Sequence, residues 1–141
     1  MPVNLDEVAL ASLEAILEEV DKSQVDRLIE IYEVEKEKVL IMAFIARQVG
    51  RGHWGKPRSY LTSIGRNKIS CSAARLYKVL SQCRNDEVKI ALGFFKWFYE
   101  AGKDRRSILR KLREEYKITN ASQSAPSGFV NEYLKTILGL K

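Results

Sequence analysis

Apolar residues recur every three or four positions along most of this 141-residue chain. From Leu5 to Val20 they follow the repeat of an amphipathic helix, and Asn4 and Glu7 form the pattern of an N-terminal capping box. The same spacing recurs over residues 23–32, 70–82, 87–101, 107–116 and 129–140. Since no stretch reads as a strand, we predict an all-α fold, a single compact helical bundle of five to six helices.

Other segments complete the predicted organisation. The run Val39–Ala46 is apolar on all sides, which favours the central, most buried helix. Ser59–Gly65 is expected to form one or two helical turns. We predict a bundle domain over residues 1–118. A flexible linker of small polar residues follows at 119–128, and a C-terminal helix at 129–141 docks on the bundle or on a neighbouring subunit.

Composition and hydropathy exclude several classes of protein. With 45% hydrophobic residues and only 3 prolines, the chain is neither disordered nor collagen-like. Its longest apolar run spans eight residues, Val39–Ala46, whereas a membrane-spanning helix needs about 20. The first residues are acidic, unlike a signal peptide. We therefore expect a cytoplasmic protein with no membrane partner.

Residues that carry catalysis are scarce. His53 is the one histidine of the sequence, so His-paired nucleophiles and multi-His metal sites are excluded. Cys71 and Cys83 lie on one predicted helix, too far apart to form a disulfide with each other. No phosphate-binding loop or dinucleotide fingerprint occurs. We expect no enzyme activity, no metal and no cofactor.

Charge is strongly segregated along the chain. Residues 1–37 carry a net charge of −8, whereas residues 38–85 hold ten bases and no acid. Residues 86–141 add +4, which gives +6 in total. The acidic helices either balance the fold or present an acidic face to another copy. The basic middle third lacks local carboxylate partners, and such a stretch is typical of proteins that bind phosphates.

The segment 47–58 combines bases, glycines and aromatic residues. Glycines let backbone N–H groups approach an anion, guanidinium groups match phosphate geometry, and Trp54 could stack on an unpaired base. The alternative is that Trp54 lies in the core and the charges are only solvated. The candidate nucleic-acid-binding residues here are Arg47, Arg51, His53, Trp54, Lys56 and Arg58.

Further bases extend this candidate surface. Two lie in the turn that follows segment 47–58, and one lies on the next predicted helix. The other three share one face of the basic helix predicted near residues 107–116, where the alternative is again a solvated surface. These candidates are Arg66, Lys68, Arg75, Arg106, Arg110 and Arg113.

Three segments carry a family resemblance. The segment Ile69–Tyr77 (ISCSAARLY) resembles the Ser/Thr-rich turn that enters an Arg-bearing helix in the small helical subunits of type III CRISPR effector complexes. Phe44–Gly52 (FIARQVGRG) and Leu92–Glu100 (LGFFKWFYE) are also similar to sequences of that family. The resemblance covers most of residues 25–102. It does not include the loop of glycines and Trp54 at residues 50–57 or the tail beyond Gly102.

This resemblance implies a non-catalytic subunit that stacks in several copies along guide RNA and target strand. It implies that Arg47, Arg51 and Arg75 contact the nucleic-acid backbone. The expected partners are then nucleic acid, RNA or another single strand rather than duplex DNA, together with other protein subunits and copies of the chain itself.

Two other functions remain open. The first is a DNA-binding regulator whose helix-turn-helix consists of Ser59–Gly65 and Ser70–Gln82, although Ala73 and Ala74 offer little chemistry for reading base edges. The second is an interaction scaffold whose basic face meets an acidic protein.

Overall fold

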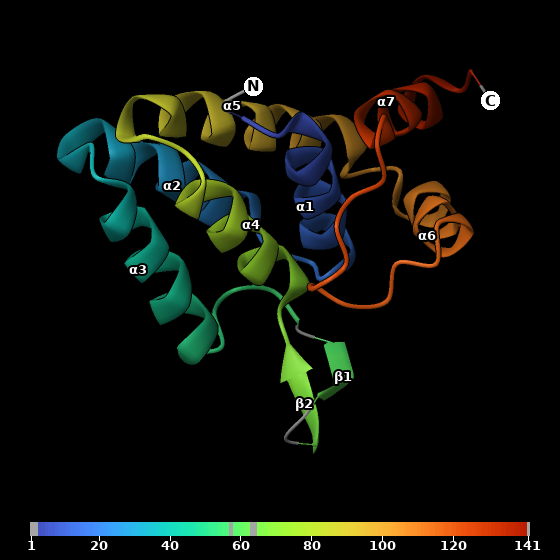
Figure 1. Ribbon diagram of the computed structural model, residues 1–141, viewed down its shortest axis with the longest axis horizontal. Helices are drawn as coiled ribbons and strands as arrows, with labels where there is room; N and C mark the ends of the chain where they lie inside the picture. The colour runs from blue at the N-terminus through green and yellow to red at the C-terminus, as the bar shows by residue number, and fades with distance from the viewer. Residues whose placement is uncertain (1–2, 57, 63–64, 141) are drawn as a thin grey trace.

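Helices account for most of the regular structure, and one short hairpin projects from them (Figure 1). The structure, a computed structural model, describes residues 3–56, 58–62 and 65–140, and only the backbone of 58–62 and 65–68. The elements in chain order are α1 (Leu5–Leu17), α2 (Lys22–Glu35), α3 (Lys38–Gly50), β1 (Arg58–Thr62), β2 (Gly65–Ile69), α4 (Cys71–Ser81), α5 (Asn85–Gly102), α6 (Arg106–Glu115) and α7 (Phe129–Leu138). The predicted helical class is confirmed, and the described part of the chain holds seven helices rather than five to six.

The centre of the fold is α1. Every residue from Glu7 to Leu17 is buried, and α1 contacts α4, α5, α6 and α7. The prediction that Val39–Ala46 forms the central helix is wrong. That run lies in α3, which packs mainly against α2 and α4 and leaves Val39 63% exposed. An all-apolar run indicates that a helix can be buried, but the burial of each face depends on how many neighbours pack around it.

Two predicted helix starts are confirmed by their caps. The Asn4 side chain accepts a hydrogen bond from the Glu7 N–H (3.2 Å) and begins α1. The Ser70 hydroxyl accepts one from the Ala73 N–H (3.1 Å) and begins α4. Each cap satisfies a backbone donor that would otherwise lack a partner in the first helical turn.

The expected helical turns at Ser59–Gly65 are not formed. Strands β1 and β2 instead pair antiparallel, from Arg58 opposite Ile69 to Thr62 opposite Gly65. A helix of one or two turns is unstable by itself, whereas aromatic and β-branched residues such as those of the Tyr60–Thr62 stretch favour an extended backbone. The helix-turn-helix hypothesis thereby loses its first helix.

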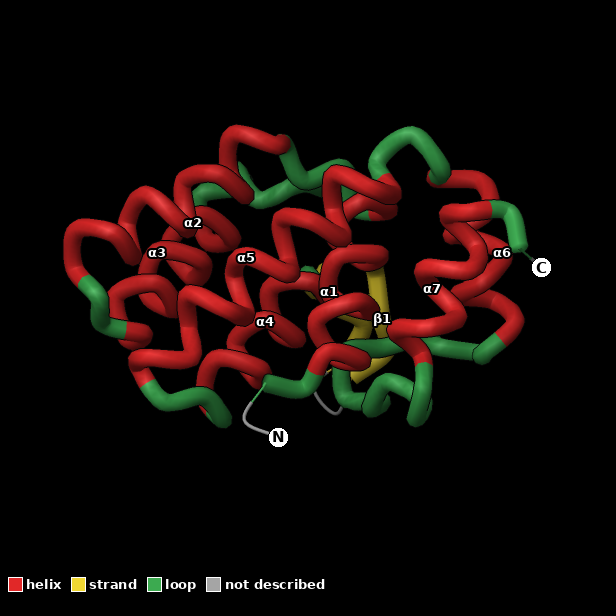
Figure 2. Tube along the Cα trace, turned by 90° about the horizontal axis from the view of Figure 1, so that it is seen from above, coloured by secondary structure: helices red, strands yellow, loops and turns green. Residues whose placement is uncertain are grey.

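The molecule is elongated, with α2 and α3 at one end and α6 and α7 at the other (Figures 1 and 2). The expected linker before α7 bonds to α1: the Ala125 N–H donates to Glu7, and the N–H groups of Gly128 and Val130 donate to Asp6. Helix α7 packs against α1 and α6. Within the described residues, every helix is too short or too polar to span a bilayer.

Candidate nucleic-acid interface

A pocket of about 300 Å³ lies between α2 and α3. The two helices are consecutive and pack against each other, so the end of α3 comes beside the start of α2. We call this the arginine pocket, and it is lined by Ser23, Gln24, Arg27, Phe44, Arg47, Gln48 and Arg51.

Three arginines give the arginine pocket its charge. The side chains of Arg27, Arg47 and Arg51 are exposed. Among the described residues, no carboxylate lies within ion-pairing distance of any of them. Guanidinium groups that have no internal partner are available to bind anions, and a phosphate matches their donor geometry.

Two of these arginines were predicted from the sequence, and the third was not. Arg47 and Arg51 were predicted, and the structure brings them together. Arg27 belongs to the acidic first third of the chain, where its single positive charge gave no signal. The packing of α2 against α3 is what adds Arg27 to the site.

Gln48 is the buried polar member of the pocket. Its side chain is 7% exposed, and its Nε2 donates a hydrogen bond to Gln24 Oε1 (3.0 Å). Its backbone carbonyl accepts a hydrogen bond from the N–H of His53, whose side chain is exposed. The Gln48 Oε1 atom is buried and has no hydrogen-bond partner in the described part of the chain.

Trp54 lies in the core, so the expectation that it stacks on a base is wrong. The side chain is 1% exposed, and its Nε1 donates a hydrogen bond to Ser72 Oγ (2.9 Å). Gly55 has a φ of +61° and packs so closely that a Cβ atom there would lie 2.5 Å from the Glu18 carbonyl oxygen. The Trp54–Lys56 part of the loop after α3 is therefore anchored to the end of α1 and to α4.

Arg75 is also buried, and the prediction that it contacts nucleic acid is wrong. Its guanidinium is fully buried; Nε bonds to Glu14 Oε1 (2.7 Å), and Nη1 bonds to Glu7 Oε1 (2.9 Å). Nη1 and Nη2 also donate to the carbonyl oxygens of Gln123 and Asn120. A buried charge requires such partners, and here they leave no donor for a phosphate.

The same buried cluster changes the acidity of α1. Burial raises the pKa of Glu14 to about 7, although the hydrogen bond from Arg75 opposes this shift. Burial also raises the pKa of Glu18, whose carboxylate accepts hydrogen bonds from the hydroxyls of Ser70 and Ser72. Through these hydrogen bonds the two acids connect α1 to α4 and to its cap residue Ser70.

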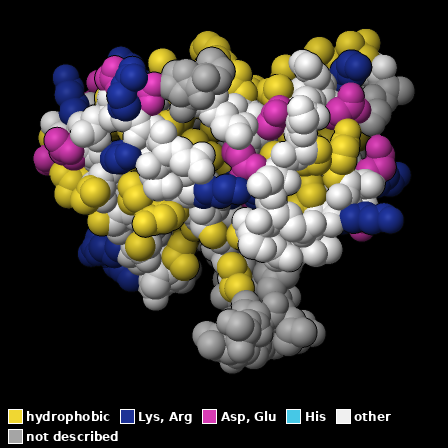
Figure 3. Space-filling view, viewed as in Figure 1, with side chains coloured by type: hydrophobic (Ala, Val, Ile, Leu, Met, Phe, Trp, Pro, Cys, Tyr) yellow, Lys and Arg dark blue, Asp and Glu magenta, His cyan; other side chains and the backbone are white. Residues whose placement is uncertain are grey.

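The remaining candidate bases do not gather in one place. Lys56 and Arg106 both pair with Glu19, at 3.4 and 3.6 Å. Arg110 is exposed, and Arg113 Nε donates to the Ile118 carbonyl oxygen (3.0 Å). Helix α6 lies at the opposite end of the molecule from α3 (Figure 2), and Lys and Arg side chains are scattered over the face shown in Figure 3. The candidate bases with described side chains therefore do not form one continuous surface.

The hairpin carries the other candidates. The backbones of Arg58, Arg66 and Lys68 lie in β1 and β2, and their side chains are outside the described residues. The loop that follows α3 leads directly into this hairpin (Figure 1).

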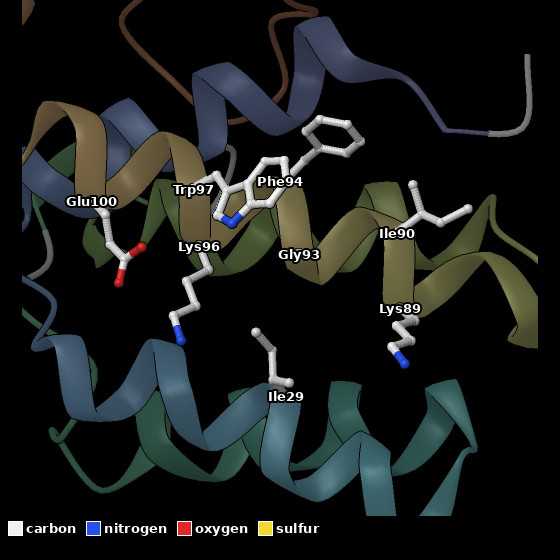
Figure 4. A pocket seen from close by; sticks show the side chains of 8 residues that line it. All are labelled: Ile29, Lys89, Ile90, Gly93, Phe94, Lys96, Trp97 and Glu100. Atoms are coloured by element: carbon white, nitrogen blue, oxygen red, sulfur yellow. The ribbon is translucent and has the colours of Figure 1, made fainter.

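Trp97 is an exposed aromatic residue that sequence analysis missed. Its side chain is 67% exposed in a groove of about 500 Å³ between α2 and α5 (Figure 4), and its ring lies edge-on to Phe94 with centroids 5.7 Å apart. Neither Phe94 nor Trp97 belongs to the buried face of α5. Its position outside the apolar repeat of this helix could have identified Trp97 as exposed. Lys96 in this groove pairs with Asp26 (3.0 Å), and Lys89 with Glu33 (3.8 Å), so the groove has no excess of positive charge.

Comparison of the chain with protein-family models, curated proteins and solved structures finds no match. The described residues contain no group of three His, Cys, Asp or Glu side chains placed to hold a metal ion. The arginine pocket is therefore the strongest candidate site, and its chemistry is that of anion binding.

Proposed function

We propose that this protein binds nucleic acid through the sugar–phosphate backbone, with the arginine pocket as the principal contact. The observation that carries the proposal is the convergence of Arg27, Arg47 and Arg51, all exposed and without a carboxylate partner among the described residues, on one pocket. Each guanidinium can donate two parallel hydrogen bonds to one phosphate, and several such contacts give affinity that does not depend on base sequence.

The hairpin supports the same proposal. Arg58, Arg66 and Lys68 lie on its two strands, and it follows the loop that ends α3. A strand of nucleic acid held at the arginine pocket would thus run close to a second basic element. The resemblance over residues 25–102 further supports a role as a non-catalytic subunit of an RNA-guided type III CRISPR ribonucleoprotein, which acts in the cytoplasm, with Arg75 serving as a structural residue.

Salt-dependent binding tests this function. We expect the wild-type protein to bind a labelled single-stranded RNA, and its affinity to fall steeply between about 50 and 200 mM salt because bound counterions are released. Arg47→Ala should lower the affinity about fivefold to tenfold for every sequence, the effect of losing one charged contact. It should also make the salt dependence shallower by about 0.7 in logarithmic slope. Fluorescence anisotropy measures both quantities.

Lys135→Ala is the matched control. Lys135 is an exposed base on α7, at the other end of the molecule from α3, so its removal changes the net charge equally. The proposal is wrong if both variants reduce the affinity by the same factor, or if the wild-type protein binds no nucleic acid at low salt. The second outcome would favour an interaction scaffold that binds an acidic protein.

A further inference from the structure

The arginine pocket contains an acceptor that a phosphate cannot satisfy. Gln48 Oε1 is buried and unpartnered in the described structure, and an unmet buried acceptor destabilises a protein. Phosphate oxygens are themselves acceptors, so a phosphate in the pocket bonds to the arginines and leaves Gln48 Oε1 unsatisfied. A ligand that satisfies every group of this pocket must therefore carry a hydrogen-bond donor next to its negative charge.

The other polar groups of the pocket leave this role open. The side-chain oxygen of Gln24, Oε1, already accepts a hydrogen bond from Gln48 Nε2. The side-chain group that Gln24 can still offer to a ligand is its NH2 donor. Arg27, Arg47 and Arg51 are donors only. A ligand that satisfies this arrangement carries a phosphate and, next to it, one hydroxyl group.

RNA has this combination in every nucleotide, and DNA does not. The ribose 2′-hydroxyl is a donor as well as an acceptor, and it lies next to the backbone phosphate. A volume of about 300 Å³ is at the small end of ligand pockets and gives room for one sugar–phosphate unit.

We propose that the arginine pocket distinguishes RNA from DNA, with Gln48 Oε1 accepting a hydrogen bond from a ribose 2′-hydroxyl while the arginines hold the adjacent phosphate. Because Oε1 is buried, this proposal includes a turn of the Gln48 amide that exposes the oxygen to the pocket and gives up the hydrogen bond from Nε2 to Gln24. This inference rests on the proposed function and adds the class of nucleic acid to it.

Three oligonucleotides of the same base sequence test the inference. They are single-stranded RNA, its 2′-fluoro analogue and DNA, all composed of A, C and G so that their bases are identical. The fluoro analogue keeps the RNA sugar conformation but lacks the hydroxyl donor, so it separates hydrogen bonding from strand shape. We expect the wild-type protein to bind RNA about threefold to tenfold more tightly than either of the others, the range of one hydrogen bond.

Gln48→Met removes the acceptor and keeps the length of the side chain. We expect its affinity for RNA to fall to the level measured for DNA, while its affinity for DNA and for the fluoro analogue stays unchanged. Gln82→Met, a change of an exposed glutamine after α4, should retain the preference for RNA. The thermal midpoint of Gln48→Met should stay close to that of the wild type, because loss of the hydrogen bond to Gln24 offsets removal of the buried unmet acceptor.

The outcomes separate the two proposals. Equal wild-type affinity for the three strands, with a steep salt dependence, overturns the reading of the hydroxyl and leaves backbone binding in place. A preference for RNA that persists in Gln48→Met also overturns it. Absence of binding to every strand overturns both proposals.

Discussion

The Glu14 carboxyl group and the Arg75 guanidinium are hydrogen-bonded in the interior of the protein. Each charge there is stabilised by the opposite charge of its partner. Arg75 also bonds to Glu7, so one cation serves two buried carboxylates. Because burial favours the neutral form of an acid, Glu14 has its pKa raised to about 7. The protonation state of Glu14 therefore changes near neutral pH.

The pH dependence of stability follows from the sign of this shift. A pKa raised above the ordinary value of 4.5 means that the folded state binds the Glu14 proton more tightly than the unfolded state. Its contribution to stability is complete below pH 4.5 and is lost as the pH rises through about 7. We expect the wild type to be more stable at pH 5.5 than at pH 8, with about 2 kcal/mol of the difference due to Glu14.

Urea unfolding at the two pH values checks this prediction. Glu14→Gln cannot titrate there and should show a smaller difference in the free energy of unfolding. Glu30→Gln, at an exposed position on α2, is the control and should behave like the wild type. An equal pH dependence in all three proteins would contradict the assignment.

The loop between α3 and β1 is held by contacts to the end of α1. Trp54 is buried, the Lys56 N–H donates to the Glu18 carbonyl oxygen, and Gly55 provides the positive φ between them. Because this loop begins directly after Arg51, the anchor also fixes the end of α3 that borders the arginine pocket.

Two glycine substitutions separate this role from a general effect of adding a methyl group. Gly55→Ala should reduce the free energy of unfolding by about 2 kcal/mol or more, because of the positive φ and the contact with Glu18. Gly93→Ala, in α5, places its methyl group where no atom lies within 4 Å, and should raise stability by about 0.5–1 kcal/mol. Chemical denaturation measures both changes, and a neutral Gly55→Ala would show that the loop is not anchored as described.

Helices were predictable at this scale, but their neighbours were not. Leu5–Val20 and Glu87–Ala101 carry a local repeat, and the structure forms helices in both places. The hairpin is held by pairing between strands, for which a short segment carries little local signal. Periodicity also does not specify which helix lies at the centre, so Val39–Ala46 was predicted as the central helix, a position that α1 occupies.

At the scale of the whole molecule, two of the candidate basic sites lie at opposite ends. The arginine pocket lies between α2 and α3, and Arg110 lies on α6 at the opposite end (Figure 2). A short oligonucleotide held in the pocket does not reach α6, whereas a long one can extend toward it.

Oligonucleotide length therefore reveals whether α6 takes part in binding. We expect Arg110→Ala to change the affinity for a strand of about six nucleotides by less than about twofold, whereas Arg27→Ala lowers it about fivefold to tenfold. The same titration with a strand several times longer shows whether α6 adds a contact. A large effect of Arg110→Ala on the short strand would contradict the assignment of the principal site to the arginine pocket.

The candidate site could be predicted only in part. Arg47 and Arg51 were identifiable because a basic stretch without acids is visible in the sequence. Arg27 is part of the site because α2 packs against α3. Arg75 is not part of it because it is buried against Glu14 and Glu7, which lie 61 or more residues away along the chain. Contacts over such separations are created by the tertiary fold.

The central position of α1 has a consequence for biosynthesis. Of the elements described, α1 leaves the ribosome first, yet Arg75 follows Glu14 by 61 residues, an interval of about 3–12 s at ordinary rates of translation. During that time its apolar face and its two acids have no permanent neighbour. The nascent chain must remain unfolded, or be sheltered by a chaperone, until α4 and α5 have been made.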